Sequence, residues 1–209
     1  MPCIRTLCLA LVPLALAAVA SVPGGMQRVV RTARAADVGV FPGHPRLIVG
    51  GYRGPSVADL RAACAHRDMQ GKCDEIGGSH VLDNAMRYLL DGDPNAAGQV
   101  RAALLIGRTC GDGYEQTAAG GYALAYDWVH DALTPDHRLQ IESTLAACGT
   151  SIARSLRGES PHLWHGYTSQ AAALALIALA LDDHPARDTL RADAAELFRG
   201  RALEAYAVT

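Results

Sequence analysis

The sequence predicts an all-α protein built from antiparallel helical hairpins, and three observations lead to this expectation. Hydrophobic residues make up 50% of the 209 residues and aromatic residues only 5%. Alanine and leucine dominate the chain, and both are good helix formers. Apolar residues recur every three or four positions in one segment after another, and no strand-type alternation follows Val49. Short turns separate these segments, as they do in helical hairpins.

The N-terminus predicts export. Residues 1–20 have one positive charge, an apolar run and an A-x-A cleavage site at the end, which is typical of a secretory signal peptide. A membrane anchor fits less well, because the apolar run is short and Pro13 interrupts it. A flexible leader, 21–43, and a helical domain, 44–209, are expected to follow. We therefore expect a periplasmic or secreted protein with no membrane segment after removal of the signal.

Export bears on whether the cysteines form disulfides. Two of the six lie in the predicted signal, and the mature chain keeps Cys64, Cys73, Cys110 and Cys148. An even number in an oxidising compartment predicts two disulfides, for which three pairings exist. We favour Cys64–Cys73, closing a short loop between helices, and Cys110–Cys148, tying two hairpins together. A zinc site is not expected, since the chain has no C-x-x-C motif.

Start signals and periodicity place seven helices after a short extended segment at 44–49. The expected helices, in order, cover about 56–66, 79–91, 95–108, 115–133, 135–156, 160–183 and 186–207. Ser56 and Asp59 have the spacing of a capping box, and Thr134-Pro135 is a typical helix start. The residues expected to face inward include Leu82, Ala85, Met86, Leu89, Val100, Ala103, Leu104, Gly107, Tyr122, Tyr126, Val129, Leu133, Ile141, Leu145, Cys148, Ile152, Leu156, Leu190, Ala194, Leu197 and Leu203.

Two features suggest close packing of these helices. Gly120-Gly121 either weakens the fourth helix or lets another backbone approach closely. In the sixth, which Ser160 and Pro161 are expected to open, residues 171–181 are all apolar, so it should be buried on all sides. Eleven residues are too few to span a bilayer, which needs about 20. An open solenoid or a closed toroid of hairpins would both fit, and a buried helix favours two layers.

Three short stretches of sequence, called phrases below, occur in an order that resembles that of a known family. They are HPRLIV at 44–49, LAYDW at 124–128 followed by DALTP at 131–135, and WHGY at 164–167 before the alanine- and leucine-rich helix. Over 44–207 the chain resembles the N-terminal helical domain of heparinase II/III-like and alginate-lyase-like polysaccharide lyases. The resemblance implies an incomplete (α/α) toroid that a β-sandwich would follow. The chain would then be a member truncated at its C-terminus.

The resemblance also implies an activity, cleavage of an acidic, uronate-containing polysaccharide by β-elimination without a cofactor. One group must neutralise the uronate carboxylate, and a Tyr or His must take the neighbouring proton. His165 matches the histidine of the family's Asn-His pair, whereas Trp164 stands where the family has asparagine. His165 and the nearby Tyr167 are therefore the catalytic candidates, although no motif assigns Tyr167 its role.

The other candidate residues have structural alternatives. Trp164 and Trp128 could stack on sugar rings, or could be core aromatics, which is the better expectation for Trp128. His162 could contact the substrate, but with His165 it lacks a third metal ligand, so no metal is expected. Asp127 is expected to orient a neighbouring helix end.

The expected partners follow from charge and from the truncation that the resemblance implies. The balance of 19 basic and 21 acidic residues argues against nucleic acid. If the toroid is incomplete, Leu190, Leu197 and Leu203 should be partly exposed, and the chain should self-associate through this last helix. The alternative to a lyase is a non-catalytic helical-repeat module that binds a partner or acts as a scaffold.

Overall fold

A computed structural model of the chain describes residues 43–49, 54–66, 70, 73, 80–106, 110, 113–158 and 165–198, with the backbone alone at 113, 114 and 165. All of them belong to one compact unit, Gly39–Thr209. The predicted signal peptide and almost all of the predicted leader lie outside the described residues. So do Ser160, Pro161 and Leu203.

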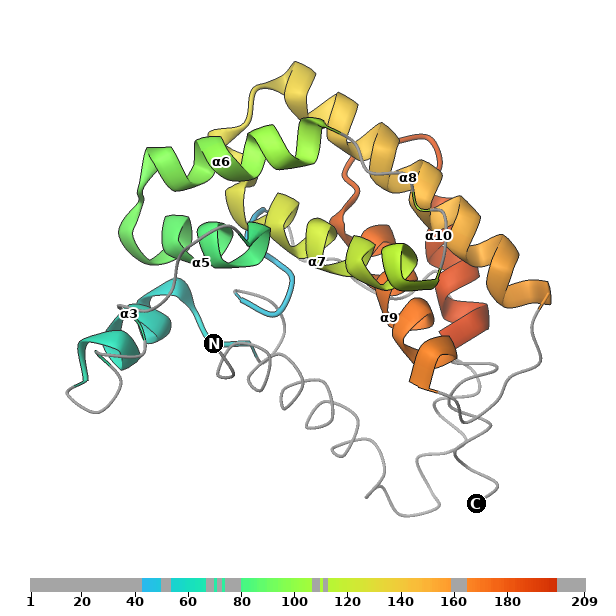
Figure 1. Cartoon of the computed structure of the whole chain (residues 1–209), viewed down its shortest axis with the longest axis horizontal. Helices are drawn as coiled ribbons and strands as arrows, with labels where there is room; N and C mark the ends of the chain where they lie inside the picture. The colour runs from blue at the N-terminus through green and yellow to red at the C-terminus, as the bar shows by residue number, and fades with distance from the viewer. Residues whose placement is uncertain are drawn as a thin grey trace, which may run out of the picture. The chain divides into compact units, whose positions relative to one another are not determined.

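The described residues confirm an all-α fold, with no strand among them (Figure 1). The helices are α3 (Val57–Ala65), α5 (Val81–Asp91), α6 (Pro94–Leu105), α7 (Gly113–Val129), the short 3-10 helix η2 (His130–Ala132), α8 (Pro135–Gly158), α9 (His165–Ala180) and α10 (Arg187–Ala194). In the described part of the chain, none of these helices combines the length and the apolar character that crossing a membrane requires.

Local signals set the helix starts as predicted. Ser56 Oγ accepts from the Asp59 amide at 3.0 Å, and the Asp59 carboxylate accepts from the Ser56 amide at 2.9 Å, which completes the capping box. The Ser56 hydroxyl also donates to this carboxylate at 2.7 Å, and this bond, followed by the one from the Ser56 amide, lowers the pKa of Asp59. Gly92 ends α5 in the left-handed region at φ 70°, and Asp93 caps α6, whose first residue is Pro94. Cap chemistry therefore decides these boundaries.

Helix α9 is the centre of the packing, in contact with α7, α8 and α10. Leu174, Ile177 and Leu181 are completely buried. Leu176 and Leu179, on another face, are only partly buried. The prediction of complete burial therefore holds for most of the helix but not for this face.

Of the two alternatives expected at Gly120-Gly121, a weaker helix or the close approach of another backbone, the structure shows close approach at Gly120. A Cβ added to Gly120 would lie 3.0 Å from the Cα of Ala173, so the backbones of α7 and α9 meet there without a side chain between them. Gly121 faces only the Leu82 side chain. Gly120 is thus the position at which α7 accommodates α9.

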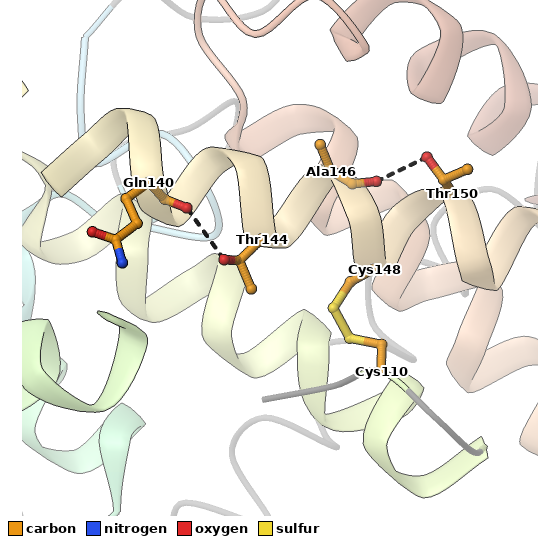
Figure 2. Close-up of a disulfide and its surroundings, with 6 residues drawn as sticks. All are labelled: Cys110, Gln140, Thr144, Ala146, Cys148 and Thr150. Carbon is orange, nitrogen blue, oxygen red and sulfur yellow. Dashed lines mark hydrogen bonds between the residues drawn. A yellow bond between two sulfur atoms is a disulfide. The ribbon is translucent and has the colours of Figure 1, made fainter. Parts of the chain in front are cut away.

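Both favoured disulfides are present. Cys64 of α3 pairs with Cys73, and Cys110 pairs with Cys148. Figure 2 shows the second bond joining the segment before α7 to the middle of α8. Since 38 residues separate Cys110 from Cys148 and only 9 separate Cys64 from Cys73, the second bond is the longer-range constraint.

The predicted exposure of the last helix is wrong for the two leucines that can be examined. Leu190 of α10 is 1% exposed, because α10 packs on both α8 and α9, and Leu197, shortly after the end of α10, is 0% exposed. Leu190 approaches α8 where Gly149 leaves room for its methyl groups. Exposed leucines on this helix therefore give no basis for the expected self-association. Among the described residues, the large hydrophobic side chains that are exposed are Ile106 and Leu139.

The two disulfides should differ in their contribution to stability. Loop-closure entropy predicts that replacing Cys110 and Cys148 by serine lowers the free energy of unfolding by roughly 4 kcal/mol, and replacing Cys64 and Cys73 by roughly 2.5 kcal/mol. Urea denaturation of the oxidised proteins measures both. Equal losses, or a larger loss for the Cys64–Cys73 pair, would contradict the loop-length argument.

Gly120→Ala should destabilise the chain by about 1–3 kcal/mol, because the new methyl group meets backbone that cannot move aside cheaply. Gly98→Ala is the matched control within α6, where an added Cβ meets nothing within 4 Å. That change should stabilise by about 0.5–1 kcal/mol through helix propensity. Thermal unfolding of the two variants tests the difference, and a stable Gly120→Ala protein would show that α7 and α9 do not meet closely.

Candidate functional site

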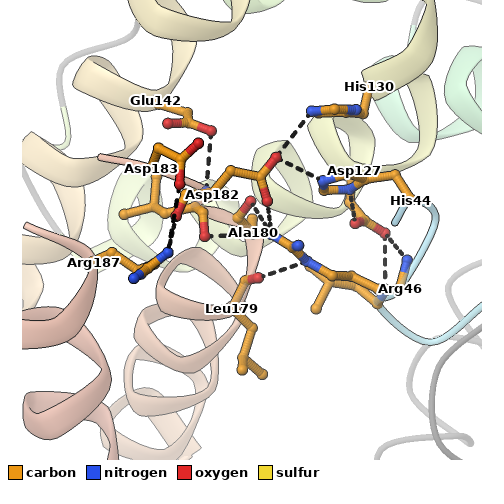
Figure 3. A network of polar contacts seen from close by, with 12 residues as sticks. His44, Arg46, Asp127, His130, Glu142, Leu179, Ala180, Asp182, Asp183 and Arg187 are labelled. Atoms are coloured by element: carbon orange, nitrogen blue, oxygen red, sulfur yellow. Dashed lines mark hydrogen bonds and ion pairs between the residues drawn. The ribbon is translucent and has the colours of Figure 1, made fainter. Parts of the chain in front are cut away.

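A polar network joins the segment 43–49 to the C-terminal ends of α7 and α9 (Figure 3). Its members include His44 and Arg46 of the segment, Asp127 of α7, His130 of η2, and Asp182 just after α9. The side chains of His44, Arg46, Asp127 and His130 are at most 9% exposed, whereas that of Asp182 is 32% exposed. The network therefore reaches solvent at Asp182.

Asp127 is the most deeply buried charge of this network. Its side chain is 0% exposed, and it accepts from His44 Nδ1 at 2.6 Å and from the backbone amides of Arg46 and Leu47 at 2.9 Å each. A buried carboxylate is tolerated only with such complete pairing. The expectation that Asp127 orients a helix end is wrong, because the partners named here belong to a non-helical segment.

That segment is bent rather than extended, which corrects a second expectation. Ile48 has a φ of 63°, and the Val49 amide donates to the Leu47 carbonyl at 2.6 Å. The same carbonyl accepts from Trp128 Nε1 at 3.1 Å. The bend exists because the amides on one side of the segment turn toward Asp127 and the Leu47 carbonyl turns toward Trp128.

Arg46 caps the C-terminus of α9. Its guanidinium donates to the carbonyls of Leu179, Ala180 and Leu181 at 3.1, 2.9 and 3.3 Å, and pairs with Asp182 Oδ1 at 2.6 Å. These carbonyls have no partner within the helix and lie at the negative end of its dipole. A cation at this position satisfies both.

Two histidines converge on the other oxygen of Asp182. His44 Nε2 lies 3.0 Å and His130 Nε2 3.1 Å from Asp182 Oδ2, and the two rings stack with centroids 3.6 Å apart. Burial is the main cause that lowers the pKa of His130, with a further contribution from His44. Burial alone would raise the pKa of Asp182, but its bonds to His44 and Arg46 outweigh burial and lower it.

Tyr126 and Glu142 hold the backbone at Asp182 in place. Tyr126 donates to Glu142 Oε1 at 2.7 Å, and the amide of Asp182 donates to the same oxygen at 3.2 Å. Burial, followed by the bond to Glu142, raises the pKa of Tyr126 far above its usual range. Tyr126 is therefore a neutral donor that fixes Glu142, which in turn holds the backbone at Asp182.

A cavity of about 210 Å³ lies beside the network, between the 43–49 segment and the helices α3 and α5. His44, Trp128 and Asp131 line one side, and Arg61 and Tyr88 line another. Arg61 already donates to the carbonyls of Leu89 and Leu90, at 2.9 and 2.7 Å, so its guanidinium is committed to the end of α5. The cavity offers aromatic and imidazole surface rather than an available cation.

Of the predicted site residues that the structure describes, Trp128 alone lines this cavity. His162 and Trp164 are outside the described residues, and of His165 the structure describes only the backbone at the start of α9. Tyr167 is 1% exposed, so in this arrangement its phenol is enclosed in the core. Trp128 is 4% exposed and hydrogen-bonded, as expected for a core aromatic. The catalytic and binding roles of these residues stay predictions.

The triad of His44, His130 and Asp182 was not predicted from the sequence. Its members come from three elements, and 138 residues separate His44 from Asp182. No local spacing relates residues so far apart, and the triad is at the opposite end of α9 from Tyr167, about 20 Å along the helix. The phrase HPRLIV, which contains His44, was the one available signal.

Comparisons with known protein families, with curated proteins and with solved structures give no significant match. The geometry of the described residues is therefore the basis for assigning chemistry to this chain. It offers a buried ion-pair network at one end of α9 and, at the other end, a helix start next to the predicted catalytic residues.

Asp127→Asn should lower the free energy of unfolding by about 2–4 kcal/mol, because the amide offers one acceptor oxygen and turns an NH₂ group toward a donor. Asp131→Asn is the control, since Asp131 also contacts a histidine but its side chain is 73% exposed. We expect less than about 0.5 kcal/mol there. Urea unfolding compares the two, and similar losses would mean that Asp127 does not anchor the 43–49 segment.

Proposed function

We propose that the chain is the helical part of an exported lyase, an incomplete (α/α) toroid that cleaves a uronate-containing polysaccharide by β-elimination. One observation carries the proposal. Two of the three phrases on which the family resemblance depends are in direct contact, through Asp127 with His44 and through Trp128 with Leu47. Phrases that form one interaction across about 80 residues are more informative than separate short matches.

The packing of the helices supports the same proposal. Helices that follow one another in the chain, α5 with α6, α6 with α7, α7 with α8, and α8 with α9, contact each other. α9 also contacts α7 and α10 and so lies among its neighbours, as an inner helix of two layers would. Two disulfides fit a protein that works outside the cytoplasm.

The proposed chemistry uses the N-terminal end of α9. The positive end of the helix dipole at a helix start favours an anion such as the uronate carboxylate, and His165 at that start adds a group that can neutralise it. A base, His165 or Tyr167, takes the proton next to the carboxylate. The electron pair forms the new carbon–carbon double bond, and the glycosidic oxygen leaves and receives a proton. The product is an unsaturated uronate.

A non-catalytic binding module is the second candidate, and the burial of Tyr167 favours it. A phenol that is 1% exposed cannot touch a polymer unless the start of α9 opens. Such a module would bind the acidic glycan and release no product. The two functions therefore differ in a single measurement.

Incubation with a panel of acidic polysaccharides, followed by ultraviolet absorbance of the unsaturated uronate, tests the proposal. We expect product with at least one uronate-containing glycan, and a loss of about 100-fold or more for His165→Ala. His80→Ala is the matched control, because His80 is exposed at the start of α5 and makes no side-chain capping bond.

Binding without product would favour the non-catalytic module. Absence of both binding and product across the panel would refute both functions. Product formation that survives His165→Ala would make His165 a structural residue.

A further inference from the structure

We propose that His44, His130 and Asp182 form a binding site for a divalent transition metal ion of the zinc class, in which two imidazole nitrogens and one carboxylate oxygen are the ligands. The site lies at the C-terminal end of α9 and does not depend on the proposed lyase activity. It arises from tertiary contacts alone, since the three residues come from the 43–49 segment, η2 and the turn after α9.

The three donor atoms have almost the spacing of a metal site. They all lie within 4.8 Å of one another, and Asp182 Oδ2 is 3.0 Å from His44 Nε2 and 3.1 Å from His130 Nε2. Zinc–ligand bonds of about 2.0–2.1 Å in a tetrahedron place neighbouring ligand atoms about 3.3 Å apart. The two distances to Asp182 Oδ2 are therefore already close to those between ligand atoms of a tetrahedral zinc site.

The outer nitrogens of both rings are held by carboxylates. His44 Nδ1 is 2.6 Å from Asp127 Oδ1, and His130 Nδ1 is 3.2 Å from Asp131 Oδ1. Metal-binding histidines usually donate their second ring N–H to such an acceptor, which fixes the tautomer and leaves the other nitrogen's lone pair for the ion. The structure thus has this outer arrangement at both histidines independently.

The remaining contacts of Asp182 leave one of its carboxylate oxygens, Oδ2, for a bond to the metal ion. Arg46 occupies Oδ1 at 2.6 Å, and so leaves Oδ2 as the ligand atom. The Asp182 amide is held by Glu142, and its carbonyl accepts from Arg187, which fixes the backbone of this turn (Figure 3). Each contact that could compete for the ion is therefore directed at a different atom of Asp182.

Charge in the site also favours a cation. Each of the carboxylates of Asp127, Asp131 and Asp182 contacts at least one of two stacked imidazoles, whose centroids are 3.6 Å apart. One divalent ion between the rings and Asp182 would neutralise part of this concentrated negative charge. Arg46 compensates part of the remaining negative charge.

The ligand set indicates the class of ion. Two imidazoles with one carboxylate suit zinc and its transition-metal neighbours, whereas magnesium and calcium prefer oxygen ligands throughout. Asp182 is 32% exposed, so a water molecule has access to the fourth position. Binding would join three elements that are distant in sequence, and would stabilise the folded chain by mass action.

The test uses the chain from residue 21 without a histidine tag, oxidised and treated with a chelator, and Zn²⁺ as the titrant. We expect one Zn²⁺ per chain by calorimetry and a higher melting temperature when Zn²⁺ is present. His130→Ala and Asp182→Asn should each weaken binding by about 100-fold or more, since each removes a ligand. The four cysteines are paired in the oxidised protein, and so cannot supply the ligands.

Two control variants locate the ion. His80→Ala, at an exposed position, should bind Zn²⁺ as the unmodified chain does. His165→Ala should also bind unchanged, which separates this site from a pair formed by His162 and His165. Far-ultraviolet circular dichroism checks that each variant folds, and Co²⁺ substitution reports nitrogen ligands through its visible spectrum.

Absence of Zn²⁺ binding to the folded, unmodified chain would overturn the proposal. So would binding that survives both His130→Ala and Asp182→Asn. Failure of this experiment would leave the lyase proposal in place, because that proposal concerns the other end of α9 and has a different readout.

Discussion

The carboxylate of Asp127 has no contact with water, and the charge is stable there because donors from a distant segment surround it. The dependence is mutual. Two amides of the 43–49 segment would be buried without partners if Asp127 were absent, and Asp127 would be an isolated buried charge without them. The position of this segment, and through it that of His44 and Arg46, therefore follows from one ion-pairing requirement at the end of α7.

The C-terminal end of α9 is the second place where long-range contacts meet. Arg46 donates to its last carbonyls from one side, and Arg191 of α10 donates to Ala178 and Leu181 from another. Both arginines satisfy acceptors that the helix itself leaves unpaired, and both lie at the negative end of its dipole. The triad at Asp182 follows directly after this end, so capping the helix also places the possible metal ligands.

Close backbone packing completes the arrangement. Gly120 lets α7 approach α9, and Gly149 leaves space on α8 for Leu190 of α10. The Cys110–Cys148 bond adds a covalent link between the segment before α7 and the middle of α8. Small residues on α7 and α8 thus face α9 and α10, and the α-helices keep their register because larger side chains would not fit.

Helix class, the capping box at Ser56 and Asp59, and the helix start at Thr134-Pro135 could be predicted because each depends on residues close together in the chain. The disulfide pairing was also predicted. The sequence alone could not determine the burial of Leu190 and Leu197, the bend at Ile48, or the meeting of His44, His130 and Asp182. These depend on which segments pack together, and only the tertiary structure decides that, because a contact across 138 residues leaves no periodic trace in the sequence.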